Sequence, residues 1–330
     1  MNRKRIIRLI VSFFLISILL YWIDLDQTIK LLESTNFLMI GLALIIATID
    51  RVFMPVKWNI LLRAKKINIP WSEAITVYYT SSFLGLFLPP TIGSDLIRAY
   101  SVSKKHDRID IITSIVVERV FGAIALLFFG IMGGLIFLRM FSTVGFAIEP
   151  ILWITISLSI LGIGGFILSL TDTFGRFVSL FLGKYHNMIY LGRLIQKLEK
   201  MYQSYRSYST TKGAVVFFFL LSLLENILPI VRPYIVALAF GVSLPIEYFF
   251  AMVPLVLIMI RLPISFDGFG IHEGAFVYFL SLVGVSETTA FSIGLMSHII
   301  FLIALLPGGL FYAVNPNFKE ARLSTANKSS

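Results

Sequence analysis

The stretches LPPTIGSD at residues 88–95 and LPISFDGFG at residues 262–270 decide how this chain folds. Each places a Leu-Pro pair, then glycine and aspartate, in the middle of an otherwise apolar run. Proline removes a backbone donor and glycine loosens a helix, so both runs are expected to break there. A matched pair of broken apolar segments, one in each half of a membrane protein, points to a transport site. The expected breaks are Pro89, Pro90 and Gly93 in the first stretch and Pro263, Gly268 and Gly270 in the second.

The composition is that of a membrane protein. Hydrophobic residues make up 57% of the 330 residues and charged residues only 14%. Uncharged runs recur at Val120–Leu138, Ile151–Leu170 and Thr288–Leu306. Each is about as long as the ~20 residues that a spanning helix needs.

The chain has no cysteine, which excludes disulfides, thiolate metal sites and cysteine nucleophiles. Its four histidines, His106, His186, His272 and His298, have no metal-ligand spacing in the sequence. We therefore expect no cofactor and no metal.

The net charge of +10 follows the positive-inside rule, because the basic residues lie in short loops between apolar runs. No aromatic stacking platform accompanies them, so nucleic acid is not an expected partner.

The basic N-terminus and the run at residues 6–23 resemble a signal peptide without a cleavage site, so we expect an uncleaved anchor. Both termini are then cytoplasmic, and the chain belongs in the cell (inner) membrane. The second helix starts near Phe37 and ends near the basic residues Lys57, Arg63, Lys65 and Lys66.

The charge pattern favours a re-entrant hairpin at the first break. If Ala74–Ile92 crossed the membrane, the four basic residues that follow within sixteen positions would lie outside. A hairpin that enters from the cytoplasm and returns avoids this cost. At the second break, Tyr248–Ile260 and Ala275–Val285 are each too short to span, so they predict a hairpin that enters from the opposite side.

The resulting expectation is an all-α polytopic membrane protein with about six spanning helices plus two re-entrant helical hairpins in an inverted repeat. It forms one domain over residues 1–330, with a first half at about 37–170 and a second half at 213–314. A cytoplasmic amphipathic linker at 172–212 joins them, and a cytoplasmic tail follows at 315–330. The basic face of the linker suits either a plain connection or contact with anionic lipid. Pro229 and Pro233 are expected to interrupt the helix that begins at Gly213.

Ionisable side chains within the apolar runs are the candidate site residues. A charge at membrane depth costs at least ~2.5 kcal/mol, so it marks a functional candidate. Asp95 could instead cap a helix, Glu118 and Arg119 could form structural ion pairs, and His272 could be a core histidine or a proton relay. Asp50 and Arg51 could reach an interface by snorkelling. The candidate substrate-binding residues are Asp95, Arg98, Glu118, Arg119, Glu225, Arg232, Arg261, Asp267, His272 and Glu273.

These motifs, taken together, resemble the flippase-like transmembrane domain of the lysylphosphatidylglycerol synthase group. The resemblance covers the chain from about residue 37. It rests on FLPPTIG at 87–93 with Asp95 and RAY at 98–100, VERVFG at 117–122, LP at 262–263 through HEG at 272–274, GVS at 284–286 and PGG at 307–309. Two positions depart from the family pattern: Asp267 replaces a small residue, and His272 stands where arginine is usual.

The resemblance implies translocation of an anionic, aminoacylated or polyprenyl-linked lipid. We expect no enzymatic activity of the chain itself. The largest loop is too short for the synthase domain that accompanies this region in larger relatives. Expected partners are membrane lipids, either a phospholipid or a polyprenyl-linked lipid. A homo-oligomer and a separate lipid-modifying or glycosyltransferase enzyme stay open as further partners. An inverted-repeat transporter of a small solute or ion is the first alternative, and a membrane-embedded lipid-modifying enzyme is the second.

Overall fold

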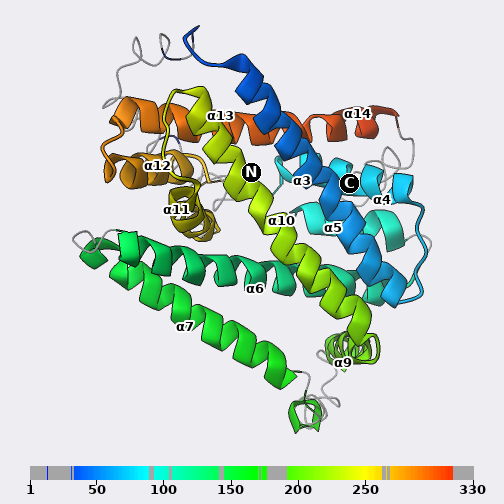
Figure 1. The fold of residues 1–330 in the computed structure, drawn as a ribbon. Coiled ribbons are helices and arrows are strands. Elements are labelled where there is room, and N and C mark those ends of the chain that lie inside the picture. The colour runs from blue at the N-terminus through cyan, green and yellow to red at the C-terminus, as the bar shows by residue number, and fades with distance from the viewer. Residues whose placement is uncertain are drawn as a thin grey trace.

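The computed structural model consists of helices joined by short connections (Figure 1). It describes residues 33–88, 93–103, 106–140, 145–169, 173–176, 192–261 and 268–314, together with Phe13, Leu31, Thr171 and Ser265. Within these ranges the regular elements are all helical, which confirms the all-α class. They are α3 (Phe37–Ala64), α4 (Trp71–Gly85), α5 (Gly93–Ser103), α6 (Arg108–Met140), α7 (Gly145–Ser169), α9 (Gly192–Arg206), η1 (Ser207–Thr210), α10 (Lys212–Ala239), α11 (Ile246–Ile260), α12 (Ile271–Ser281), α13 (Glu287–Leu305) and α14 (Pro307–Val314).

Four stretches are long and apolar enough to cross a membrane: Phe37–Ala64, Arg108–Ile136, Lys212–Ala239 and Glu287–Val314. Phe37–Ala64 and Lys212–Ala239 are mostly unburied by the protein itself, as expected of surfaces that face lipid, whereas more than half of the apolar window in Glu287–Val314 is buried. The total of about six spans stays a prediction, because the expected anchor at residues 6–23 lies outside the described residues apart from Phe13. Exposed large apolar side chains include Leu38, Ile45 and Ile49 on α3, Trp153, Ile160 and Leu161 on α7, and Val216, Phe217 and Leu220 on α10.

Two pairs of short helices stand where the sequence predicts broken runs. In the first pair α4 ends at Gly85 and α5 begins at Gly93; in the second α11 ends at Ile260 and α12 begins at Ile271. Gly268 and Gly270 have φ of 82° and 83°, in the left-handed region that glycine adopts without strain. Pro89, Pro90, Pro263 and Asp267 lie outside the described residues. The depth of both breaks in a membrane stays a prediction.

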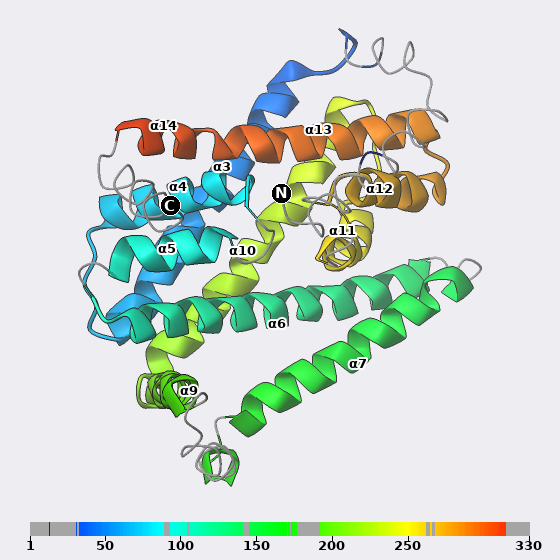
Figure 2. The same ribbon diagram turned by 180° about the vertical axis from the view of Figure 1, so that it is seen from behind.

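The order long helix, short pair, long helix occurs twice, as α3, α4–α5, α6 and as α10, α11–α12, α13–α14. Helices α3 and α10 are antiparallel neighbours: the Asn36 N–H donates to the Ala239 carbonyl at one end (3.0 Å), and the Tyr208 hydroxyl donates to the Leu61 carbonyl near the other (3.2 Å). Helix α6 runs along one side of the molecule and α13–α14 along the opposite side, with both short pairs between them (Figures 1 and 2). Helix α11 packs on α6, and α4 packs on α14.

Helix α10 is continuous, so the predicted interruption at Pro229 and Pro233 is wrong. Each proline lacks one N–H and therefore removes one backbone hydrogen bond from a helix of 28 residues. Packing against α3 and α6 holds the remaining turns together, and this tertiary contact outweighs the local cost.

Gly133 on α6 is a close-contact position that yields a direct test of this packing. A Cβ there would lie 2.5 Å from the Phe250 carbonyl oxygen and 2.7 Å from that of Ala251, both on the backbone of α11. Gly133→Ala must push α11 away and is expected to cost about 1–3 kcal/mol of unfolding free energy. Gly122→Ala, on the same helix, meets nothing within 4 Å and is expected to stabilise by about 0.5–1 kcal/mol. Unfolding in detergent micelles measures both; equal effects would contradict the α6–α11 contact.

Candidate functional site

Four ionisable side chains on α5 and α6 form one connected group. Arg119 contacts Asp95 with two nitrogens, Nε and Nη2, each 2.9 Å from a carboxylate oxygen. Arg98 Nη2 also donates to Asp95 (3.2 Å), while its Nη1 lies 2.7 Å from Glu118 Oε2. Asp95 and Arg98, three positions apart, therefore share a face of α5. Glu118 and Arg119, adjacent in sequence, contact different partners.

Arg98 is enclosed on all sides by this group and by two aromatic rings. Its guanidinium lies 4.7 Å from the ring centre of Trp58 and 4.6 Å from that of Tyr78. The Tyr78 hydroxyl donates to the other oxygen of Glu118 (3.0 Å). Only 3% of the Arg98 side chain is exposed, against 53% of the Arg119 side chain. The Arg98 side chain is therefore fully occupied by contacts within the protein, whereas the Arg119 side chain is still accessible from outside.

A second ion pair joins the two halves of the chain. Lys57 Nζ on α3 donates to Glu225 Oε2 on α10 at 2.8 Å, and both side chains are buried. The Lys57 ammonium also lies 5.3 Å from the centre of the Phe218 ring. From the sequence, Lys57 is only one of the basic residues near the expected end of its helix. Because α3 continues two turns further to Ala64, Lys57 sits inside the bundle instead. The one signal for this was the presence of a buried acid, Glu225, that needed a partner.

Two arginine side chains lie against the Phe301 ring of α13. Arg51 Nε donates to its neighbour Asp50 (3.0 Å), and its guanidinium lies 5.1 Å from the ring centre. The Arg232 guanidinium, from α10, lies 5.7 Å from the same ring and is buried. Arg232 has no ion-pair partner among the residues that the structure describes, and its Nε has no hydrogen-bond partner there.

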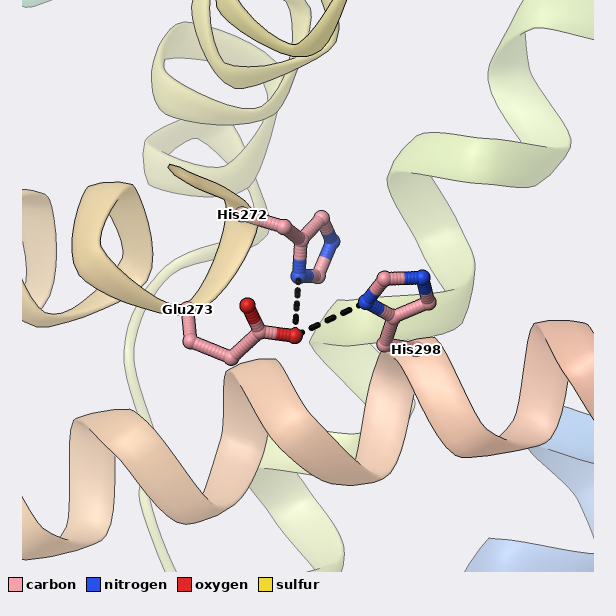
Figure 3. Close-up of side chains that lie close together, drawn as sticks. All are labelled: His272, Glu273 and His298. Atoms are coloured by element: carbon pink, nitrogen blue, oxygen red, sulfur yellow. Dashed lines mark hydrogen bonds and ion pairs between the residues drawn. The ribbon is translucent and has the colours of Figure 1, made fainter. Parts of the chain in front are cut away.

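A third group gathers at the N-terminus of α12 (Figure 3). Glu273 Oε1 lies 2.8 Å from His298 Nδ1 and 3.9 Å from His272 Nδ1. Its other oxygen accepts the Gly270 N–H at 2.6 Å, which caps the helix. The Phe269 ring stacks on His298 with ring centres 4.2 Å apart. His298 is 25 residues from Glu273 and on another helix, so sequence spacing could not reveal this contact.

The remaining sequence candidates fall at the two breaks. Arg261 follows the last residue of α11, is exposed, and has no ion-pair partner among the residues described. It lies close enough to Arg119 and Glu225 for both to act on its charge. Gly93 is the first residue of α5 and Gly270 is the N-cap of α12. Asp267 is the one charged candidate that lies outside the described residues.

The linker between the halves is tied to the ends of the long helices. Lys65, just after α3, donates to the hydroxyls of Ser207 (2.6 Å) and Ser204 (2.7 Å) and to Asp110 at the start of α6 (3.2 Å). Burial lowers the pKa of Lys65 below its ordinary value, and Asp110 opposes this effect. Helix α9 therefore has a packing role within the protein. A contact between the basic face of the linker and anionic lipid stays a prediction.

A chain of antiparallel apolar helices with ion pairs enclosed between them is a multi-pass α-helical membrane protein. This chain belongs to the family of the lysylphosphatidylglycerol synthase transmembrane region, whose model matches residues 5–309. It is 22% identical over 313 residues to UPF0104 membrane protein MJ1595 of Methanocaldococcus jannaschii, which covers 91% of each chain. It is also 26% identical over 102 residues to UPF0104 membrane protein PH1989 of Pyrococcus horikoshii, covering 31% of this chain and 30% of the relative.

Proposed function

We propose that this protein is a lipid flippase that moves a phosphate-bearing head group across the cell (inner) membrane, with both termini cytoplasmic. The observation that carries the proposal is a pair of arginines, one from each half of the chain. Arg119 keeps 53% of its side chain exposed, and Arg261 is exposed and lacks an ion-pair partner in the described ranges. The two lie close enough to act on each other's charge. Two arginines that act on each other's charge favour an anion in their vicinity, and guanidinium binds phosphate with two parallel hydrogen bonds.

The arrangement of the halves supports an alternating route. Antiparallel α3 and α10, with a short helix pair after each, fit an inverted repeat whose two pairs are re-entrant hairpins. In that arrangement α5 and α12 point their N-termini, Gly93 and Ile271, toward the middle of the membrane. The positive end of the helix dipole favours a negative head group there. Rocking of one repeat against the other then opens the site to each leaflet in turn.

The ion pairs suggest how Arg119 exchanges partners. In the resting arrangement Arg119 is bound to Asp95, and Arg98 contacts the same carboxylate. When Arg119 turns to a lipid phosphate, Arg98 continues to compensate the charge of Asp95. The partly buried carboxylate of Asp95 therefore always keeps a cation beside it, and losing that cation would be costly. The acyl chains stay in the bilayer throughout. No chemical step is assigned to the protein, and a separate lipid-modifying or glycosyltransferase enzyme would supply the lipid.

Reconstitution with fluorescent lipids tests the proposal. Liposomes containing the protein are expected to move labelled anionic or polyprenyl-linked phospholipid between leaflets faster than empty liposomes. Arg119→Gln and Arg261→Gln each remove one charge-assisted phosphate contact worth about 1.5–3 kcal/mol, so each is expected to slow the flip rate roughly tenfold or more. Loss of access of an external quencher to the label measures the rate.

Arg63→Gln is the matched control. Arg63 is an exposed arginine at the end of α3, where it lies 4.7 Å from the Trp71 ring and away from the ion-pair groups. Its variant is expected to flip lipid at the wild-type rate. A wild-type rate no higher than that of empty liposomes for every anionic and polyprenyl lipid would overturn the proposal. Equal slowing by all three substitutions would overturn the role of Arg119 and Arg261.

A transporter of a small solute or ion is the second candidate. The buried group of His272, Glu273 and His298 favours it, because imidazole and carboxylate side chains can pass a proton along a pathway. Solute-driven currents in proteoliposomes that contain no labelled lipid would support this candidate over the flippase.

A further inference from the structure

We propose that His272, Glu273 and His298 form a binding site for a transition-metal dication, with Zn²⁺ as the metal that the ligands fit best. This inference is independent of lipid movement. Each residue offers one ligand atom, and these atoms lie within 4.8 Å of one another. Two imidazole nitrogens and one carboxylate oxygen are a known three-ligand set for zinc, with the fourth position left to water or an oxygen of a bound molecule.

The unsatisfied nitrogen of His272 points to a missing ligand. Its Nδ1 is buried, faces the Glu273 carboxylate at 3.9 Å, and has no hydrogen-bond partner in the described structure (Figure 3). The His298 Nδ1 faces the same oxygen at 2.8 Å. A buried polar atom without a partner is costly, and a metal held between the three side chains would satisfy it. Ligand atoms around a tetrahedral Zn²⁺ lie about 3.3 Å apart, so small side-chain rotations assemble the site.

The surroundings hold the three ligands in place. Glu273 is oriented by the Gly270 N–H that its second oxygen accepts (2.6 Å). His298 is stacked against Phe269, and His272 packs on Phe276 with ring centres 4.8 Å apart. Such outer contacts set the orientation of metal ligands and exclude solvent. The three ligands therefore lie on α12 and α13, and Phe269 and Gly270, just before α12, help to hold them in place.

The local charge selects the class of metal. Arg232 lies close enough to act on His272, and its positive charge opposes any cation there. Ca²⁺ and Mg²⁺ are bound mainly by the charge and number of oxygen ligands, and this site offers one carboxylate. Zn²⁺ binds imidazole nitrogen strongly in addition, so it tolerates the nearby arginine better.

Zinc titration of the full chain tests the site. Protein in detergent micelles is stripped with a chelator and titrated with Zn²⁺ against a chromophoric competitor. We expect one Zn²⁺ per chain. His272→Gln, Glu273→Gln and His298→Gln are each expected to weaken binding by about 100-fold or more, since loss of a mere outer-shell partner already costs 10–100-fold. His106→Gln, a partly exposed histidine between α5 and α6, is the matched control and should bind as the wild type does. Failure of the wild type to bind one equivalent, or equal affinity in His298→Gln, would overturn the site.

A variant that replaces His298 by another metal ligand distinguishes loss of the metal site from misfolding of the protein. The chain has no cysteine, so a new thiolate ligand gives an unambiguous signal. His298→Cys is expected to retain the metal. With Co²⁺ in place of Zn²⁺ it should show a thiolate-to-cobalt absorption band in the near ultraviolet that the wild type lacks. A folded His298→Cys variant without that band would overturn the assignment of His298 as a ligand.

Discussion

Replacing Lys57 by methionine is expected to lower the free energy of unfolding by about 3–5 kcal/mol. In the wild type the Lys57 ammonium lies 2.8 Å from the Glu225 carboxylate. Methionine keeps the length of the side chain but leaves that buried carboxylate without its cation. No other described cation forms an ion pair with Glu225. The desolvation cost of the carboxylate is then no longer offset. Unfolding in mixed detergent micelles, followed by circular dichroism, measures the change. Glu225→Met should cost a similar amount, since it leaves the ammonium of Lys57 unpaired.

The double variant Lys57→Met with Glu225→Met is the decisive control. It removes both charges and fills the space with apolar atoms, so its stability is expected to return to within about 1 kcal/mol of the wild type. Additive losses in the double variant, or no loss in either single variant, would contradict a buried ion pair between α3 and α10. The intact ion pair costs little free energy. A shift in register between α3 and α10 would separate the two charges, so any packing with such a shift would be less stable.

Arg98→Gln is expected to be the second large loss, about 3 kcal/mol of unfolding free energy. Glutamine cannot neutralise Glu118, whose side chain is only 6% exposed. It also removes the planar cation that fills the space between Trp58 and Tyr78. Arg98→Lys keeps the charge but cannot reach Asp95 and Glu118 with a fork while lying flat on two rings, so it should recover only part of the loss. The same unfolding measurement applies.

Arg119→Gln provides the contrast. Arg119 contacts the same carboxylate, that of Asp95, but 53% of its side chain is exposed. Solvent screens such a pair, and Arg98 still compensates Asp95, so the expected loss of stability is under about 1 kcal/mol. Equal destabilisation by Arg98→Gln and Arg119→Gln would contradict the division between a structural arginine and one available to a ligand. We therefore expect Arg98→Gln to lower the free energy of unfolding, whereas Arg119→Gln reduces the flip rate with little change in stability.

The charged side chains inside the protein have two different roles, and the extent of their burial distinguishes these roles. Arg98 and Lys57 are almost fully enclosed, and each neutralises a buried acid on another helix. Arg119 and Arg261 are accessible and lie within reach of each other's charge. From the sequence, Arg98, Arg119 and Arg261 are all candidate substrate-binding residues. The packing separates them and leaves the last two as the candidates for head-group binding.

The sequence alone determined the membrane class, the helical breaks and most of the candidate residues. These features depend on local physics: the length of an apolar run sets whether it can span, and proline and glycine close together in such a run weaken the helix there. Charge within an apolar run is costly in any fold, which is why Glu225 and Glu273 could be selected without coordinates. The family itself was also recognisable, because its motifs occur in order along the chain.

Only the tertiary structure decided which charges meet. Lys57 pairs with a residue 168 positions away, and His298 reaches Glu273 from another helix. Helix α10 continues through two prolines because its neighbours hold it, which local propensity could not anticipate. The strength of an ion pair depends on distance and on the water that packing excludes, and both arise only when remote segments come together.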